Sequence, residues 1–334
     1  MTRARSVAVI GAGMAGLACA RALADAGIAV TVFEKSRGTG GRMSTRRRDE
    51  AAWDHGAQYF TARDPTFRAE VGEWVRQGHA ARWEPRLAVL GSAKQPDTSE
   101  PPERFVGAPR MTSPAAHLAQ GLTVLTEHTV AQLERDAGAW RIVTAEHGTH
   151  GPFDAVALAN PAPQARRLLL PVSPALAGSA ASVTMQPCWA AMLRYESSIS
   201  LPFDGAFVNE GPLRWVARNS AKPGRAGAEA WVLHASAEWS VAYLEAAAEE
   251  AGALLVEAFR ALGAPQPAGW SAHRWRFSLA ETPLDVECLW DPGVRVGACG
   301  DWVLGGRVEG AWLSGRHLAR RIADFRGGEA PPGR

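Results

Sequence analysis

The first 34 residues pass from an apolar run through a glycine-rich break into two further apolar runs, and this order predicts a strand, a helix and a strand. Residues 6–10 are almost wholly apolar and predict a buried strand. Residues 17–26, rich in alanine and leucine, predict a helix that Gly27 ends, because glycine readily takes the left-handed conformation found after helices. Residues 29–33 predict a second strand, followed at once by Glu34. A βαβ unit of this kind implies a parallel sheet.

Beyond this unit the pattern changes and indicates a second lobe. Helical spacing over residues 67–78 gives way to sequence broken by proline and glycine up to about residue 108. One amphipathic helix is expected over residues 237–262, and a last helix over residues 313–325. The tail, residues 327–334, is expected to be frayed. Short apolar runs predict further strands over residues 122–125, 130–133, 140–144, 155–159, 189–195, 230–235 and 294–298.

Composition places the chain among ordinary globular proteins. Hydrophobic residues make up 46% and charged residues 21% of the 334 residues, a length that suits two lobes. The formal net charge is +2, so no strong attraction to nucleic acid or to an anionic membrane is expected. The basic residues are nearly all arginines, and lysine occurs only at Lys35, Lys94 and Lys222.

The cysteines favour neither a redox motif nor a metal site. Cys19, Cys188, Cys288 and Cys299 show no C-x-x-C spacing and no cluster with histidine. A dithiol motif, a zinc site and a disulfide framework are therefore not expected, and a reducing cytoplasm is the predicted compartment.

The apolar run over residues 7–20 imitates a signal peptide, but cleavage there would destroy a glycine motif. No run reaches the roughly 18 apolar residues of a membrane helix.

That glycine motif carries the clearest chemical signal. Gly11 permits a tight turn, Gly13 lets backbone approach a pyrophosphate, and Gly16 lets the helix pack on the sheet. The helix N-terminus offers unpaired N–H groups and a positive dipole end to phosphates. Glu34, 18 residues after Gly16, would accept hydrogen bonds from ribose hydroxyls. The motif predicts a dinucleotide site; the alternative is a glycine-rich turn beside a solvated Glu34.

A second glycine cluster, residues 38–41, follows the acid directly and favours FAD over NAD. Its glycines would let backbone pack over a dinucleotide, and Arg42 would neutralise a phosphate. The arginine run at residues 46–48 is expected to be a solvated turn rather than a nucleic-acid patch. Near the C-terminus, residues 297–301 form a predicted strand that runs into Gly-Asp, and residues 310–315 open the last helix.

Several segments together resemble the bacterial renalase-like flavoproteins, which lie within the superfamily of the amine oxidases and para-hydroxybenzoate hydroxylase. The pattern E-K-x-x-x-x-G-G-R over residues 34–42 is similar to that of the superfamily. The renalase type is indicated by the combination of residues 33–47, 54–61, 273–278 and 300–312. The resemblance covers essentially the whole chain.

The resemblance implies an α/β architecture, with a Rossmann-type FAD-binding domain and a second, mixed-sheet α+β substrate domain, as in para-hydroxybenzoate hydroxylase. The FAD-binding domain would be discontinuous and formed by residues 1–64, 109–164 and 286–326. The substrate domain would comprise residues 65–108 and 165–285.

The resemblance also implies an activity, the oxidation of misreduced nicotinamide dinucleotides (the 2- and 6-dihydro isomers) to NAD(P)+. Electrons would pass to noncovalent FAD, as no cysteine lies within residues 305–310, and then to O2, giving hydrogen peroxide. A dihydropyridine is already a hydride donor and needs positioning more than acid–base help. The sequence fits, because no Ser-His-Asp or Cys-His arrangement presents itself. The expected partners are a small-molecule substrate and O2, with no nucleic acid and no membrane.

The family resemblance assigns roles to residues near the flavin. Asp301 would hold the ribityl chain, and the N-terminus of the last helix would face the pyrimidine edge of the flavin. His55 and Gln58 would lie near the flavin ring. The residues expected to bind the cofactor are Gly11, Ala12, Gly13, Met14, Ala15, Gly16, Glu34, Lys35, Gly40, Gly41, Arg42, Met43, His55, Gly56, Ala57, Gln58, Val130, Gly300, Asp301, Glu309, Gly310 and Ala311.

The catalytic candidates are Tyr59, His273 and Trp275. Tyr59 and Trp275, together with Phe277, are candidate pocket walls, although each is as readily explained as core. His273 and Arg274 would contact flavin or substrate, against the alternative of a structural histidine. Of thirteen tryptophans, most are expected to fill the core rather than form an aromatic chamber beside the flavin. Those in the second lobe are Trp189, Trp215, Trp231, Trp239, Trp270 and Trp275.

Three other functions remain open. An amine oxidase shares most of these motifs and would turn over amines instead of dihydronicotinamides. A flavin-dependent aromatic hydroxylase would be reduced rapidly by NADPH. A noncatalytic flavin or nucleotide sensor would bind FAD without being reduced by any substrate. A disulfide reductase is excluded by the missing C-x-x-C and the missing second G-x-G-x-x-G.

Overall fold

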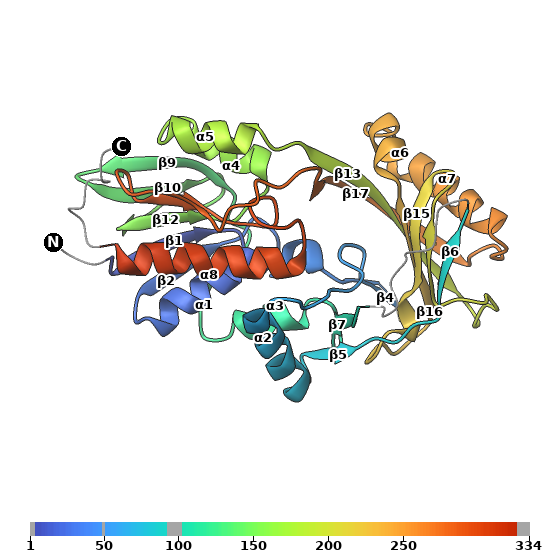
Figure 1. Cartoon of the computed structure of the whole chain (residues 1–334). Helices are drawn as coiled ribbons and strands as arrows, with labels where there is room; N and C mark the ends of the chain where they lie inside the picture. Colours follow the sequence, from blue (N-terminus) through green and yellow to red (C-terminus); the bar gives the residue numbers. More distant parts are fainter. Residues whose placement is uncertain (1–3, 49–50, 92–101, 326–334) are drawn as a thin grey trace. The chain divides into compact units, whose positions relative to one another are not determined.

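The chain divides into two compact units, each built around its own sheet. The computed structural model describes residues 4–48, 51–91 and 102–325 (Figure 1). Unit 1 contains residues 1–41, 115–184 and 280–334, and unit 2 contains residues 42–114 and 185–279. The predicted tail, residues 327–334, lies outside the described residues.

The units differ from the predicted domains in four segments. Residues 42–64 and 109–114 belong to unit 2, whereas the sequence analysis assigns them to the FAD-binding domain. Residues 165–184 and 280–285 belong to unit 1, whereas the sequence analysis assigns them to the substrate domain. The compact units are defined by contacts and not by ligands, so the division into an FAD-binding domain and a substrate domain stays a prediction.

Unit 1 holds the predicted parallel sheet. Its core strands pair in parallel, which confirms the βαβ prediction, and only the edge strand β18 runs antiparallel to its neighbour. The order is β18 (Leu289–Asp291), β19 (Val296–Ala298), β12 (Ala155–Leu158), β1 (Ser6–Ile10), β2 (Ala29–Phe33) and β8 (Thr123–Leu125). A separate antiparallel sheet contains β9 (Val130–Asp136), β10 (Ala139–Thr144) and β11 (Gly148–Phe153).

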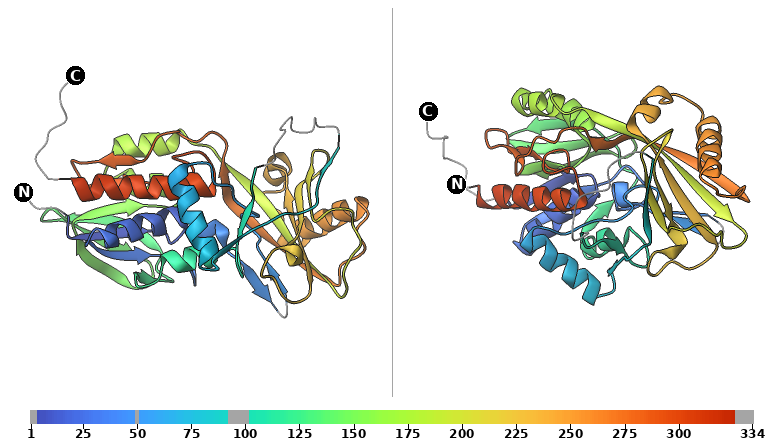
Figure 2. Two further views of the ribbon diagram at one scale, coloured as in Figure 1. Left: turned by 60° about the horizontal axis from the view of Figure 1, so that its bottom comes forward. Right: turned by 45° about the vertical axis from the view of Figure 1, so that its right-hand side comes forward.

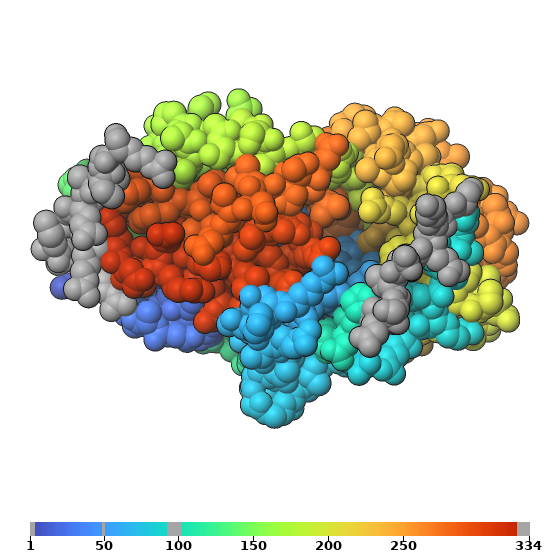
Figure 3. Space-filling model, in the orientation of Figure 1, coloured from blue at the N-terminus to red at the C-terminus, as the bar shows by residue number. Residues whose placement is uncertain are grey.

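Helices α1 (Met14–Asp25) and α8 (Val308–Asp324) lie side by side in unit 1 (Figure 1). A Cβ on Gly315 would lie 2.1 Å from the Ala15 carbonyl oxygen, so glycine is required for this close approach. The last helix begins at Val308 and not at residue 313 as predicted, because glycines hide the apolar spacing of its first turns. Figure 3 shows the outer surface of α8 and of the preceding segment in red and orange-red. The remaining helices of this unit are α4 (Ala162–Leu169) and α5 (Pro174–Ala181).

Unit 2 is built on the predicted mixed sheet. The order is β17 (Gly269–Ala280), β13 (Met185–Tyr195), β16 (Glu229–Ala235), β15 (Leu213–Arg218), β14 (Gly205–Val208) and β6 (Leu87–Leu90). The pairs β13–β16, β16–β15 and β15–β14 are antiparallel, whereas β6 pairs in parallel with β14. Successive side chains of a strand point to opposite faces of the sheet, so each strand contributes residues to both faces.

One face of this sheet packs against α6 (Ala237–Ala242) and α7 (Ala248–Ala261), as both views of Figure 2 show. The single helix predicted over residues 237–262 is therefore wrong. The Tyr243 carbonyl accepts a hydrogen bond from Trp189 Nε1 at 2.9 Å instead of continuing the helix. Trp189 and Trp231 fill this core, and Trp239 and Trp270 pack against it, which confirms the core interpretation for these four.

The opposite face of the sheet carries a small apolar cluster that includes Met192, Val232 and Trp53. Trp53 ends β4 (Ala51–Trp53), which pairs with β3 (Arg46–Arg48). The arginine run is exposed as predicted, but it forms a strand and not a turn.

The remaining elements include one helix of 12 residues, α2, and several short ones. They are α2 (Pro65–Arg76), α3 (Ser113–Leu118), β5 (Ala80–Arg82), β7 (Phe105–Gly107), η1 (Gly41–Met43) and η2 (Asn219–Ala221). Within the part of the chain that the structure describes, no helix combines the length and the apolar character needed to cross a membrane.

Candidate cofactor and substrate sites

In unit 1, the predicted nucleotide residues gather at one edge of the parallel sheet. Ile10, Phe33, Leu158 and Ala298 end four adjacent strands and lie opposite one another in the register. Segments that follow the carboxyl ends of parallel strands therefore meet there, and this edge is where open α/β sheets bind ligands. The glycine turn, Glu34 and the Gly300–Asp301 turn all follow these ends.

The first glycine turn leaves no space for a side chain at Gly16, but it leaves space at Gly13. Gly11 has φ = +109°, a conformation that favours glycine. A Cβ on Gly16 would lie 1.9 Å from the Gly11 carbonyl oxygen, whereas a Cβ on Gly13 would have no heavy atom within 4 Å. Helix α1 starts at Met14 with no side-chain cap and no acidic residue in its first turn. The turn thus offers both space and N–H groups to an anion.

Glu34 is buried, which contradicts the alternative of a solvated surface acid. One carboxylate oxygen accepts the Ala12 N–H and the other accepts the Ser36 N–H, each at 2.8 Å. Each oxygen keeps a further lone pair, so the carboxylate can still accept hydroxyl donors. Lys35, beside it, is exposed.

The second glycine cluster packs against the first. The Gly40 N–H donates to the Ala12 carbonyl oxygen at 2.8 Å. A Cβ on Gly41 would lie 3.3 Å from Gly13 Cα, and Gly41 has φ = +52°. Two segments that the sequence analysis treats separately therefore form one backbone surface.

The C-terminal turn is also shaped by glycine. A Cβ on Gly300 would lie 2.9 Å from the Trp302 ring, and a Cβ on Gly310 would lie 1.8 Å from the Leu304 carbonyl oxygen. The Gly300 N–H donates to Ser314 Oγ at 3.2 Å, which ties this turn to α8. Asp301, Glu309 and Ala311 of this region are buried, and so is Val130, the first residue of β9.

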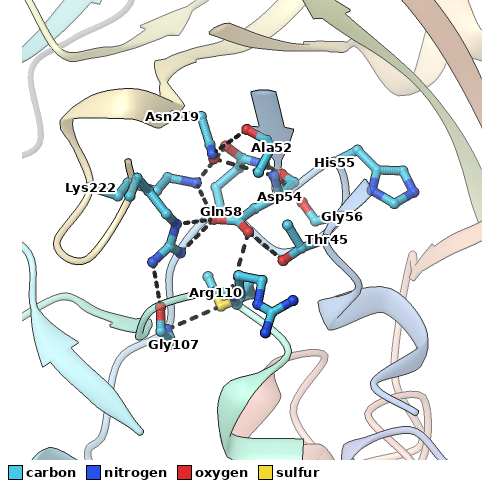
Figure 4. Close-up of polar contacts among 12 residues, drawn as sticks. Thr45, Ala52, Asp54, His55, Gly56, Gln58, Gly107, Arg110, Asn219 and Lys222 are labelled. Atoms are coloured by element: carbon cyan, nitrogen blue, oxygen red, sulfur yellow. Dashed lines mark hydrogen bonds and ion pairs between the residues drawn. The ribbon is translucent and has the colours of Figure 1, made fainter. Parts of the chain in front are cut away.

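In unit 2, Asp54 is the centre of a buried polar network (Figure 4). Its Oδ2 atom accepts from Arg225 Nη2 at 2.6 Å and from Lys222 Nζ at 3.3 Å. Its Oδ1 atom accepts from Thr45 Oγ1 at 2.6 Å and from the Met111 N–H at 3.2 Å. The Asp54 and Lys222 side chains are 0% exposed and that of Arg225 is 3% exposed.

Burial and pairing act in opposite directions on these charges. Burial alone raises the pKa of Asp54, but the charges of Lys222 and Arg225 outweigh it and lower the pKa to about 2. Burial lowers the pKa of Lys222 to about 8 despite the attraction of Asp54. At neutral pH the network therefore contains one carboxylate and two cations.

Gln58 and the turn that precedes it are held by this network and by backbone. Gln58 Oε1 accepts from Lys222 Nζ at 3.2 Å, and Gln58 Nε2 donates to the carbonyl oxygens of Asp54 and Gly56. A Cβ on Gly56 would lie 2.0 Å from the Arg42 carbonyl oxygen.

The backbone of Arg42 completes this arrangement. The Ala57 N–H donates to the Arg42 carbonyl oxygen at 2.8 Å, and the Arg42 side chain donates to the Ser278 carbonyl oxygen at 2.9 Å. Met43, next in the chain, is buried. The predicted flavin-facing segment is therefore rigidly placed within unit 2.

His55, His273 and Trp275 come together on the sheet face away from α6 and α7. The His55 ring points away from the Asp54 network (Figure 4) and stacks on Trp275 at a centroid distance of 5.0 Å. It meets His273 edge-on, also at 5.0 Å. The His55 carbonyl oxygen accepts from Trp275 Nε1 at 2.9 Å and from His234 Nε2 at 3.0 Å. Phe277 shares this strand face by alternation.

These histidines are neutral at pH 7. Burial lowers the pKa of His55 to about 3, and the nearby Arg46 and His273 add to this because each disfavours a second positive charge. Burial likewise lowers the pKa of His234 and of His273 to about 4. Neutral imidazoles beside an indole make a flat surface without added charge.

Two predicted residues lie elsewhere. Tyr59 belongs to a different aromatic cluster, with ring centroids 6.0 Å from Trp83 and 5.7 Å from Trp215. Arg274 lies on the α6 and α7 side of the sheet, where it pairs with Glu245 at 3.1 Å. Because side chains alternate along β17, Arg274 and His273 lie on opposite faces of the sheet, and their contact with flavin or substrate stays a prediction.

Sequence analysis missed Lys222 and Arg225, which lie about 170 positions after Asp54. One signal was present: Lys222 is one of three lysines in a chain whose other basic residues are arginines. The rarity of lysine was therefore the one feature of the sequence that set Lys222 apart.

The described residues offer little acid–base or metal chemistry. No group of three or more potential ligands among them is placed to hold a metal ion. Burial raises the pKa of Cys188 to about 12 and of Cys288 to about 11, so neither thiol is a ready nucleophile.

Comparisons with known proteins agree with this geometry. The model of the NAD(P)-binding Rossmann-like domain matches residues 9–73, and that of the flavin-containing amine oxidoreductases matches residues 103–323. The L-amino-acid oxidase of Bothrops pauloensis is 49% identical over 73 residues, which are 22% of this chain and 14% of the oxidase. Protoporphyrinogen oxidase 2 of Arabidopsis thaliana is 41% identical over 68 residues, 20% of this chain and 13% of that protein. The chain thus matches only a small part of the length of either relative.

A solved structure matches almost the whole fold. Cyclohexylamine oxidase from Brevibacterium oxydans IH-35A superposes with a TM-score of 0.74 at 15% identity, covering 96% of this chain and 99% of that one. At this identity the likeness establishes the architecture, a Rossmann-like domain with a second mixed-sheet domain.

Proposed function

The chain belongs to the family of flavin-containing amine oxidoreductases, and from that premise we propose that it is an FAD-dependent oxidase of misreduced nicotinamide dinucleotides. The proposed substrates are the 2- and 6-dihydro isomers of NAD(P), which would leave as NAD(P)+. When bound, the flavin would accept the hydride and pass the electrons to O2, giving hydrogen peroxide.

The residues of unit 1 fit a dinucleotide such as FAD. Gly13 has open space where a Cβ would stand, and α1 begins there without a side-chain cap. Glu34 has lone pairs left for ribose hydroxyls after accepting two backbone N–H groups. Noncovalent FAD is part of the proposal. Acid precipitation should release the flavin into the supernatant, and mass measurement should identify it as FAD rather than FMN.

One observation carries the choice of substrate: two segments that resemble the renalase-like flavoproteins meet in unit 2. Residues 54–61 and 273–278 are far apart in sequence, yet Trp275 Nε1 donates to the His55 carbonyl oxygen and the two rings stack. If both segments belong to one family-specific site, they must contact each other, whereas two unrelated core segments need not.

The surface made by His55, His273 and Trp275 suits a planar substrate. Its flat rings would orient a dihydropyridine, and its neutral histidines would leave hydride transfer without a competing proton donor. The role of these residues is therefore to bind, orient and exclude water.

Oxidation of amines is the second candidate, supported by the family match and by the fold shared with cyclohexylamine oxidase. The charges of unit 2 argue against it. Asp54 is outnumbered by Lys222 and Arg225, and Arg46 acts on His55 and His273. Excess positive charge favours an anionic dinucleotide over an ammonium ion.

Anaerobic stopped-flow absorbance of the flavin tests the proposal. The purified protein would be mixed with separated 2- and 6-dihydro isomers of NAD(P) and, in parallel, with NADPH and with amines including cyclohexylamine. Rapid bleaching by the isomers alone is expected. Bleaching by an amine with the isomers inert would replace the proposal with amine oxidation, rapid bleaching by NADPH would indicate a hydroxylase, and bleaching by none would indicate a sensor.

A further inference from the structure

Strand β15 contains a bulge at Arg214. Leu213 lies opposite Ala235 of β16 in the register. The next pair is Trp215 with His234, so Arg214 is an extra residue without an opposite partner. A bulge of this kind re-aims a side chain and is common beside functional sites. Arg214 is exposed, and among the described residues no carboxylate forms an ion pair with it.

The charge of Arg214 acts on the sheet face away from α6 and α7. Trp189 packs into the core beneath these helices, so Cys188, next to it on β13, faces the other side. The His234 ring bonds the His55 carbonyl oxygen on that same side. Burial raises the pKa of Cys188 to about 12 and lowers that of His234 to about 4, and the positive charge of Arg214 favours a lower pKa for both. Because such an effect weakens with distance, the guanidinium is near both side chains.

Aromatic rings lie on either side of this arginine along the face. On one side, His234 connects through the His55 carbonyl oxygen, at 3.0 Å, to the ring surface that includes Trp275. On the other side, Trp215 meets Phe207 with ring centroids 4.7 Å apart. Strands β17 and β15 are three positions apart in the sheet, about 14 Å at the usual strand spacing. The face therefore presents flat rings, an exposed cation and flat rings in that order.

This order matches the chemistry of a nicotinamide dinucleotide, in which a diphosphate separates two flat bases. The planar guanidinium of an arginine can bind phosphate oxygens through two parallel hydrogen bonds. The same charge would repel an ammonium ion. The residues concerned all belong to unit 2.

We propose that Arg214 binds the diphosphate of the dinucleotide substrate, while the rings of His55 and Trp275 hold its dihydropyridine. The inference deepens the proposed function and rests on it, because it names the residue that would distinguish a dinucleotide from a smaller dihydropyridine.

The test compares two substrates of the holoprotein that share the pyridine ring and differ in phosphate. They are the 6-dihydro isomers of NAD and of nicotinamide riboside, which has no phosphate. Anaerobic stopped-flow absorbance of the flavin, measured over a range of concentrations, gives the dissociation constant and the limiting rate of reduction for each.

Arg214→Met should bind dihydro-NAD about tenfold to thirtyfold more weakly and leave the limiting rate unchanged. Its affinity for the riboside should equal that of the natural chain, a difference that a merely structural role would not produce. Arg214→Lys should fall between the two, because the charge stays and the planar fork is lost. Calorimetric titration of the oxidised holoprotein with NAD+ should show the same order without turnover.

Arg260→Met is the matched control, because it removes an exposed arginine of α7 that pairs with Glu257, and it should change neither affinity. An Arg214→Met protein that binds dihydro-NAD as the natural chain does would overturn the inference and leave the proposed function intact. Equal weakening for dihydro-NAD and the riboside would also overturn it, since the residue would then act on the fold and not on phosphate. A natural chain that no dihydro isomer reduces would contradict the proposed function and the inference with it.

Discussion

The two sites are built by opposite means. In unit 1 the nucleotide turn is made of backbone, with glycines at Gly11, Gly13 and Gly16 and a single carboxylate, Glu34, that holds two N–H groups. In unit 2 the 54–58 turn is held by side-chain charges that are fully buried. The first site has no room for a Cβ at Gly16 but leaves open space at Gly13, whereas the second depends on buried charges that balance one another.

Loss of a charge in unit 2 should have the largest effect. Asp54→Asn would leave Lys222 and Arg225 buried without a carboxylate and should lower the free energy of unfolding by about 3–5 kcal/mol. Urea unfolding followed by tryptophan fluorescence measures it. Glu257→Gln, in the exposed pair with Arg260, is the control and should cost less than about 1 kcal/mol. Equal effects at the two sites would show that the buried network is not special.

The second largest effect is expected when a methyl group is added at Gly16 in unit 1. Gly16→Ala places a Cβ 1.9 Å from the Gly11 carbonyl oxygen and should weaken FAD binding about 100-fold, or about 3 kcal/mol, by displacing α1. Titration of the apoprotein with FAD measures the affinity. Gly178→Ala, on the exposed face of α5 with no atom near its Cβ, should leave the affinity unchanged.

Gly13→Ala sharpens the same comparison. Its Cβ meets no protein atom, so the stability of the apoprotein should be retained while FAD affinity falls. Full affinity in this variant would mean that the open space at Gly13 is not where the pyrophosphate binds.

Acid should act on unit 2 through its histidines. The folded pKa values of His55, His234 and His273 lie below the unfolded value of about 6.5. The unfolded chain therefore binds more protons between those values, and the free energy of unfolding should fall by at least about 2 kcal/mol as the pH drops from 7 to 4. Urea unfolding at several pH values measures this, and His273→Gln should flatten the slope. A slope unchanged by that variant would contradict the neutral state of His273.

The smallest effect is expected at Glu34. Glu34→Gln would replace one accepting oxygen by a donor and face it toward a backbone N–H, so FAD affinity should fall about tenfold, or about 1.4 kcal/mol. The affinity is measured as for Gly16→Ala. Tighter binding in the glutamine variant would exclude Glu34 as the ribose acceptor.

Local patterns predicted most of the strands of unit 1. The strands around Gly11 and the stop at Gly27 follow from apolar runs and from φ values that only glycine adopts easily. The prediction of one helix over residues 237–262 failed, and a residue distant in sequence contacts the chain where the helix is interrupted. The Tyr243 carbonyl oxygen accepts a hydrogen bond from Trp189 Nε1, and two helices stand where one long helix was expected.

By itself the sequence determined the glycine turn, the βαβ unit and the family resemblance, because each can be read from short segments without knowing which segments meet in space. The tertiary structure alone decided that Lys222 and Arg225 meet Asp54 and that Trp275 meets His55. These partners lie 168 to 220 positions apart, so no local period places them together. Their charge, burial and pKa values arise only once the sheet of unit 2 has brought them out of water.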